Sequence, residues 1–91
     1  MSQTPIRSKI GIITRVWNEE NNKLVREFTF ADFKSALKFV NKLGDIAENM
    51  NHHPDIELSW GKVRISLTTH SSNGITENDR KLANKIDEII N

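Results

Sequence analysis

Three histidines are the residues of this sequence best suited to chemistry, and each falls where a regular element is expected to end. His52 and His53 stand directly before Pro54, and His70 follows a run of alternating apolar and polar residues. An imidazole can both give and take a proton near neutral pH, because its ordinary pKa is about 6.5. Residues at the ends of elements often line clefts. Three imidazoles in one cleft could bind a polar heterocycle and move protons on it.

Each of these signals also has an ordinary structural explanation. Adjacent histidines before a proline are usually polar loop residues, and strict alternation places His70 on the polar side of its strand. Asp79 completes the pattern Thr76-Glu77-Asn78-Asp79, which is typical of a helix capping box. Glu48, one turn before His52, fits the solvated face of a helix. Taken one at a time, these residues predict no function.

A metal site is the main alternative for the three histidines. Three imidazoles are enough to hold a catalytic zinc ion. Adjacent residues such as His52 and His53 rarely aim their rings at one ion, however, and neither H-x-x-x-H nor H-E-x-x-H spacing occurs. The chain has no cysteine, no G-x-S-x-G pattern and no glycine loop of the kind that cradles phosphate. We therefore expect no metal site, no phosphate-cradling loop and no nucleophilic thiol or serine.

The size and charge of the chain narrow its class further. The 91 residues suffice for one domain, with residues 1–8 expected to form a flexible tail and residues 9–91 the domain itself. Lys and Arg number 13 against 12 Asp and Glu, which argues against direct nucleic-acid binding. No signal peptide or membrane span is recognisable, so we expect a cytoplasmic protein with no membrane partner. A domain this small is marginally stable alone, so a homo-oligomer is expected.

The first half of the chain predicts a hairpin followed by a long helix. Residues 9–17 suit a strand, residues 18–22 form a polar turn, and residues 24–30 alternate as a second strand. Asp32 can cap the helix that follows, and Pro54 ends it near Asn51 or His52. The predicted apolar stripe of this helix is Phe33, Ala36, Leu37, Val40, Leu43, Gly44, Ala47 and Met50. We interpret this stripe as core packing.

The second half repeats the layout. Ile56, Leu58 and Trp60 predict a third strand, Gly61 a tight turn, and residues 62–69 a fourth strand with one apolar face. A loop over residues 71–74 then leads to a second helix that begins at Thr76. The order β-β-α-β-β-α predicts an α+β domain in which a four-stranded antiparallel sheet carries both helices on one face.

The spacing of the polar residues resembles that of the pterin-4a-carbinolamine dehydratase family. Glu48 is followed after three residues by His52-His53-Pro54, and five further residues separate Pro54 from Trp60. Nine further residues lead to His70, and eight more to Asp79. The wider likeness covers about residues 14–90 and includes Trp17 before an acidic turn, the segment 28–33 leading into the long helix, and the segment 62–70. A match at this many points with fixed gaps is specific.

The resemblance implies an enzyme that dehydrates a 4a-hydroxytetrahydropterin to a quinonoid dihydropterin without a metal or organic cofactor. For the division of roles, we predict His52 as the acid for the leaving hydroxyl, because it closes the long helix with Glu48 one turn behind. His70 would orient the pterin and handle the N5 proton. His53 would bind the polar edge of the ring, and Asp79 would hold the tautomer of one imidazole. Glu48 would be a supporting residue next to the histidines rather than a catalytic one. The residues expected to bind substrate are Asn51, His52, His53, Thr68, Thr69, His70 and Ser71.

Two features depart from the family pattern and bear on partners. Relatives carry an extra helix before the first strand that leads into a Gly-Trp pair, whereas here a short tail precedes Val16 and Trp17. Some relatives have a cysteine where this chain has Ser72. In mammalian relatives helices form a tetramer and edge strands pair across a dimer, so a homodimer or a homotetramer is expected here.

A non-catalytic binding or assembly module is the alternative function. Some relatives act as dimerisation cofactors, and others that have lost the histidines resemble assembly factors. Ile86, Ile89 and Ile90 could form part of a partner-binding helix face, although core packing explains them as well. The presence of all three histidines favours the enzyme.

Overall fold

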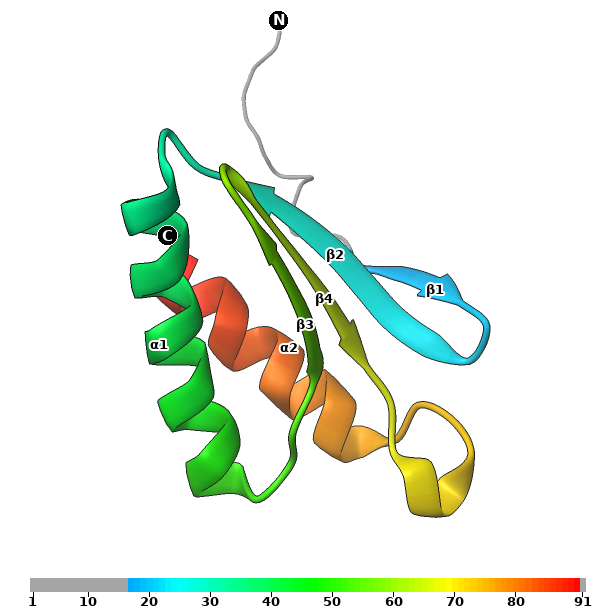
Figure 1. Cartoon of the computed structure of the whole chain (residues 1–91). Helices are drawn as coiled ribbons and strands as arrows, with labels where there is room; N and C mark the ends of the chain where they lie inside the picture. Colours follow the sequence, from blue (N-terminus) through cyan, green and yellow to red (C-terminus); the bar gives the residue numbers. More distant parts are fainter. Residues whose placement is uncertain (1–16, 91) are drawn as a thin grey trace, which may run out of the picture.

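The computed structural model describes residues 17–90, which form a sheet of four strands and two long helices (Figure 1). The strands are β1 (Asn18–Glu20), β2 (Lys23–Thr29), β3 (Asp55–Ser59) and β4 (Lys62–Leu67), and the helices are α1 (Phe33–Met50) and α2 (Glu77–Ile90). A short 3₁₀ helix, η2 (His70–Ser72), lies between β4 and α2. The strand predicted over residues 9–17 lies outside the described residues except for Trp17, as does the predicted tail.

The sheet is antiparallel throughout and has the strand order β1-β2-β4-β3. Its long central pair joins β2 to β4, with Leu24 opposite Leu67 and Phe28 opposite Val63. The buried side chains of the core cluster come from one face of the sheet and from both helices. They are Leu24, Phe28, Ala36, Phe39, Leu43, Val63, Ile65, Leu67, Leu82, Ala83 and Ile86. Both helices therefore cover the same side of the sheet, and the predicted α+β class is confirmed.

The first hairpin turns more tightly than its sequence suggests. The polar turn predicted over residues 18–22 is wrong in length, because Asn18–Glu20 pair with β2 as strand β1. Only Asn21 and Asn22 form the turn, and both have positive φ, 50° and 63°. A two-residue turn with this geometry matches the twist of the flanking strands, and asparagine tolerates it well. The side chains of β1 are exposed, so their polarity does not oppose backbone pairing.

Helix α1 begins and ends where predicted. The Asp32 carboxylate accepts a hydrogen bond from the Ser35 backbone amide at 2.8 Å, which satisfies one of the free amides of the first turn. This bond lowers the pKa of the exposed Asp32 carboxyl. At the other end Asn51 adopts the left-handed conformation, with φ of 52° and ψ of 40°. Asparagine is one of the few residues that enter this region readily, so it can close the helix.

The buried face of α1 is rotated from the predicted stripe. Phe39 is buried, although the predicted stripe omitted it, whereas Phe33 and Leu37 are 44% and 39% exposed. Trp60, predicted to continue β3, lies in the turn between β3 and β4 and is 68% exposed. The apolar arc of α1 is wider than the surface that the sheet and α2 can cover. As a result, apolar side chains remain on the outside of the domain.

Neither helix in residues 17–90 combines the length and the hydrophobicity that a membrane crossing would need.

Candidate active site

The structure brings His52 against Asp79, 27 residues further along the chain. The ring Nε2 of His52 lies 2.5 Å from the Asp79 carboxylate oxygen Oδ1. The last turn of α1 sets this position. The His52 amide donates to the Ala47 carbonyl at 3.1 Å and the Asn51 amide donates to the Glu48 carbonyl at 3.1 Å, which is the bonding pattern of a Schellman motif. His52 therefore leaves the helix pointing inward, with 13% of its side chain exposed.

Asp79 is a fully buried carboxylate near the beginning of α2. A buried charge must be matched by donors to be tolerated. Besides His52, the hydroxyl of Thr69 lies 2.8 Å from Oδ2, and the Thr76 backbone amide donates to the same oxygen at 2.8 Å. Burial raises the pKa of the Asp79 carboxyl, but the hydrogen bonds from His52, the Thr76 amide and Thr69 outweigh it and leave that pKa below its ordinary value. Asp79 is thus held as an anion beside an imidazole.

His53 has a different environment from its neighbour. Its Nε2 lies 2.7 Å from the Glu48 carboxylate oxygen Oε1, and both side chains are largely exposed, at 57% and 79%. The sequence placed Glu48 one turn behind His52, but the structure pairs it with His53. The left-handed turn at Asn51 causes this, because it folds His53 back over the last turn of α1 while His52 turns inward.

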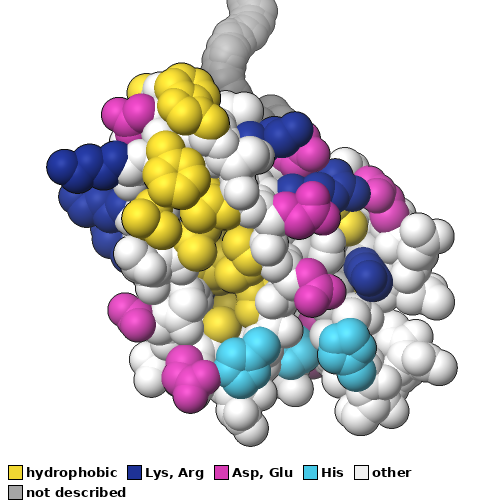
Figure 2. All heavy atoms as spheres, viewed as in Figure 1, with side chains coloured by type: hydrophobic (Ala, Val, Ile, Leu, Met, Phe, Trp, Pro, Cys, Tyr) yellow, Lys and Arg dark blue, Asp and Glu magenta, His cyan; other side chains and the backbone are white. Residues whose placement is uncertain are grey.

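His70 is exposed and begins the 3₁₀ helix η2. An isolated bridge between Thr69 and Gly74 closes the loop around it, with the Thr69 amide donating to the Gly74 carbonyl at 2.9 Å. The chain contains three histidines. Figure 2 shows the histidine side chains, in cyan, next to one another along one edge of the molecule. The end of α1 and the end of β4 thus present their imidazoles on one surface.

The remaining predicted site residues divide into two groups. Asn51 and Ser71 are exposed beside the histidines. The Thr68 hydroxyl donates to the Asn22 carbonyl at 3.1 Å, and the Thr69 hydroxyl contacts Asp79, so both threonine hydroxyls have partners within the protein. Thr76 contacts Asp79, as the predicted capping box requires, and its hydroxyl also contacts that of Thr69, which the sequence did not predict. Its place in a capping box with Asp79 was the one sequence signal for that contact.

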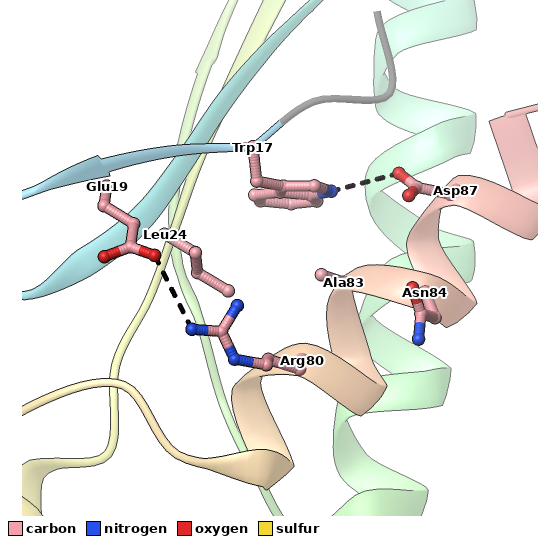
Figure 3. Close-up of a pocket in the computed structure, with 7 residues that line it drawn as sticks. All are labelled: Trp17, Glu19, Leu24, Arg80, Ala83, Asn84 and Asp87. Carbon is pink, nitrogen blue, oxygen red and sulfur yellow. Dashed lines mark hydrogen bonds and ion pairs between the residues drawn. The ribbon is translucent and has the colours of Figure 1, made fainter. Parts of the chain in front are cut away.

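Two hollows in the surface lie elsewhere. The larger, of about 310 Å³, lies between the first hairpin and α2 and is lined by Trp17, Glu19, Leu24, Arg80, Ala83, Asn84 and Asp87 (Figure 3). Several of its polar groups have partners: the Trp17 indole donates to Asp87 at 3.1 Å, and Arg80 pairs with Glu19 at 3.5 Å. Arg26 also donates to Asp87, at 2.6 Å. A smaller hollow of about 180 Å³ lies between the two helices near Phe30 and Ile89.

The acidic residues of the site do not complete a metal-binding set. Across residues 17–90, no three histidine, aspartate or glutamate side chains are grouped so that they could share an ion. His52 and His53 each face a separate carboxylate, Asp79 and Glu48, on different helices. The arrangement suits proton transfer, because each ring has one nitrogen on a carboxylate, while its other nitrogen has no hydrogen-bond partner among residues 17–90.

The fold and the site together define a class: a small α+β domain with imidazoles at the ends of a helix and a strand, one of them backed by a buried aspartate. Comparison with known families gives the class its name. The family described as pterin 4 alpha carbinolamine dehydratase matches residues 1–89. The chain therefore belongs to this family.

Individual relatives agree with this membership. A protein of Sulfurisphaera tokodaii named "Putative pterin-4-alpha-carbinolamine dehydratase" is 47% identical over 99% of this chain and 96% of its own length. A protein of the same name from Picosynechococcus is 47% identical over 98% of this chain and 96% of its own. Among solved structures, a "transcriptional coactivator/pterin dehydratase" from Brucella melitensis superposes with a TM-score of 0.78 at 36% identity, covering 81% of each chain.

The fold is also shared with a more distant structure. A pterin dehydratase-like protein described as a RuBisCO assembly factor in the alpha-carboxysome superposes with a TM-score of 0.68 at 24% identity, covering 79% of this chain and 86% of that one. At this identity the likeness concerns the fold alone.

Proposed function

We propose that this protein dehydrates a 4a-hydroxytetrahydropterin to a quinonoid dihydropterin by histidine acid–base catalysis. The observation that carries the proposal is the contact between His52 Nε2 and the buried carboxylate of Asp79. Membership of the dehydratase family supplies the reaction class. We further propose that the reaction recycles tetrahydrobiopterin after it has served a hydroxylase. The dehydration itself would need no metal ion or organic cofactor bound to this protein.

The reaction needs one acid and one base. Loss of the hydroxyl from C4a is slow unless that oxygen is protonated, and N5 must release its proton as electrons move toward C4a. Proton transfer by positioned side chains supplies about 10²–10⁴-fold in rate. That range suits a reaction that already proceeds unaided.

His52 is the proposed acid. Because Asp79 occupies its Nε2, the ring nitrogen that can exchange a proton with substrate is Nδ1. After giving up the Nδ1 proton, the ring still keeps its Nε2–H on the carboxylate. The neutral tautomer that results is therefore ready to be protonated again at the same atom.

His70 and His53 are proposed to hold the pterin. His70 would orient the ring and accept the N5 proton, and its exposed position in η2 leaves it accessible to a ligand. His53 would bind the polar edge of the ring, with Glu48 fixing its orientation at 2.7 Å. Asn51 and Ser71 flank these rings and could add hydrogen bonds.

Turnover of a chemically generated 4a-hydroxytetrahydropterin, followed by absorbance, tests the proposal. We expect micromolar wild-type protein to accelerate its decay, and His52→Ala and His70→Ala to lose most of that acceleration. Asn49→Ala, which changes an exposed residue in the same helical turn, serves as the matched control and should retain it. Near-wild-type turnover in both histidine variants would contradict the assignment of roles.

Self-association is a second property that a specific observation favours. Figure 2 shows a hydrophobic area that runs over α1 and the neighbouring hairpin down to the histidines. The large hydrophobic side chains that are exposed among the described residues are Phe33 and Leu37 of α1 and Trp60 of the turn between β3 and β4. A contiguous apolar surface on a small domain usually marks an interaction site. We propose that a second copy of the chain covers it in a homodimer or homotetramer.

Light scattering on a size-exclusion column tests this association. The wild-type protein should elute with a mass that is a multiple of 10.5 kDa, and Leu37→Glu should lower that mass. Lys81→Glu, an exposed change on α2, is the control. A wild-type monomer that also fails to accelerate pterin decay would favour the alternative function, a binding or assembly module for a different protein.

A further inference from the structure

The Asp79 oxygen that faces away from His52 is held by two threonines. We infer that Thr69 and Thr76 are positioning residues that fix the Asp79 carboxylate and, through it, the orientation of His52. This inference rests on the proposed dehydratase chemistry for its catalytic consequence. Its structural part stands on the contacts around Asp79 alone.

Three contacts converge on one oxygen of Asp79, and a fourth joins the two threonine hydroxyls. The Oδ2 of Asp79 lies 2.8 Å from the Thr69 hydroxyl, 2.8 Å from the Thr76 amide nitrogen and 3.4 Å from the Thr76 hydroxyl. The two hydroxyl oxygens are 2.7 Å apart. Oδ1 is left to face the imidazole of His52. The carboxylate therefore cannot rotate without breaking bonds to Thr69 and Thr76.

The direction of the hydroxyl bonds follows from these distances. Each hydroxyl has one proton to donate, and the ionised carboxylate can only accept. If Thr69 donates to Oδ2 and Thr76 donates to Thr69, the contacts at 2.7 and 2.8 Å are both genuine hydrogen bonds. The opposite direction would leave the Thr69 oxygen 2.8 Å from Oδ2 with no proton between them, and would use the weaker contact at 3.4 Å. The first direction is therefore the stable one.

The same threonines bracket the loop that carries His70. Thr69 follows β4 and Thr76 precedes α2, so their hydroxyl contact closes the loop of residues 70–75. The Thr69 amide also donates to Gly74 within that loop. The network thereby links the position of His70 to the carboxylate that orients His52. A positioning role for Thr69 accounts for its hydroxyl contacts to Thr76 and Asp79 better than direct binding of substrate does.

Catalytic variants provide the first test. Removing the Thr69 hydroxyl in Thr69→Val should lower kcat about tenfold, the effect of losing one hydrogen bond to a charged group, with KM changed by less than about twofold. Thr69→Ser keeps the hydroxyl and should restore turnover. Thr76→Val should have a smaller effect, because its backbone amide still donates to Asp79. Thr29→Val, which removes an exposed hydroxyl at the end of β2, is the matched control.

A carbon-13 NMR titration of the Asp79 carboxyl gives a second test that does not depend on activity. Because hydrogen bonds hold the pKa of Asp79 below its ordinary value, Thr69→Val should move the titration to higher pH and Thr69→Ser should not. An unchanged titration in Thr69→Val would overturn the inference, whatever happens to kcat. A shifted titration with wild-type kcat would overturn its catalytic part. If the wild-type protein has no dehydratase activity, the proposed function fails, and the titration alone decides whether the threonines position Asp79.

Discussion

Replacing Asp79 by asparagine keeps the shape of the side chain and removes its charge. The asparagine would offer one acceptor oxygen and one amide donor in place of two acceptor oxygens. Two donors, the Thr69 hydroxyl and the Thr76 amide, converge on the oxygen that faces away from His52. We therefore expect the asparagine oxygen to take that side and its NH₂ group to face the imidazole.

The consequence for His52 is a reversed tautomer. An NH₂ group opposite Nε2 requires that nitrogen to be the acceptor, which places the proton on Nδ1 in the neutral ring. In the protonated ring, the Nε2–H of His52 would face the NH₂ group of the asparagine, two donors with no acceptor between them. If general acid–base catalysis here supplies about 10²–10⁴-fold, Asp79→Asn should lose at least about 10²-fold in kcat. The loss in the free energy of unfolding should be only about 1–2 kcal/mol, because neutral hydrogen bonds take the place of charged ones.

Steady-state turnover and thermal unfolding separate these two effects. A loss of about 1–2 kcal/mol should lower Tm by roughly 5–15 °C in a domain of this size, so the variant stays folded at assay temperature. Long-range nitrogen-15 NMR correlations of the imidazole report which ring nitrogen carries the proton. Turnover in Asp79→Asn within about twofold of wild type would refute the reasoning, since the tautomer would then have no catalytic importance.

Three further predictions concern stability. The free energy of unfolding should fall as pH drops below about 3.9, the ordinary pKa of aspartate. Because the folded protein lowers the pKa of Asp79, this residue stabilises the fold fully above that pH, and the stabilisation is lost as pH falls through the folded-state pKa. Urea unfolding at several pH values should show that the free energy of unfolding falls less steeply with pH in Asp79→Asn, and equal slopes would contradict this. Ile65→Val deletes one methyl group from a fully buried strand position and should cost about 1 kcal/mol in urea unfolding while leaving kcat unchanged; a large loss of turnover would show that the core and the site are coupled. Asn22→Gly should stabilise the protein by about 0.5 kcal/mol, because glycine adopts the positive φ of 63° more readily, and a lower Tm would contradict the assigned turn.

Much of the fold follows from local patterns in the sequence. The alternation in residues 24–30 and 62–69, the Asp32 cap and the break before Pro54 each depend on neighbours within a few residues, and the structure agrees with them. The predictions fail where contacts between distant parts of the chain determine the structure. Asn18–Glu20 pair as a strand despite their polarity, because an exposed edge needs only backbone hydrogen bonds. Which side of α1 is buried depends on the position of α2, so Phe39 was missed and Leu37 misplaced.

The candidate site shows the same division. The spacing of the histidines and Asp79 marked the residues, and the capping pattern placed Asp79 at the start of a helix. The sequence could not tell which histidine meets Asp79, because that contact depends on how the end of α1 meets the start of α2. The sequence placed Glu48 one turn before His52, whereas in the structure its carboxylate contacts His53, since one left-handed residue, Asn51, decides which ring turns inward.

The contact between His52 and Asp79 also joins two helix ends that would otherwise fray independently. Terminal turns normally open with little free energy, and their amides exchange with solvent quickly. Here His52, which directly follows the C-cap of α1, and Asp79 in the first turn of α2 share one partly buried hydrogen bond. Opening either end must break it and strand a buried charge, so the amides of the two turns should exchange together and slowly. Local opening at this point would separate His52 from Asp79, so under the proposed mechanism the same contact would protect both the two helix ends and the catalytic geometry.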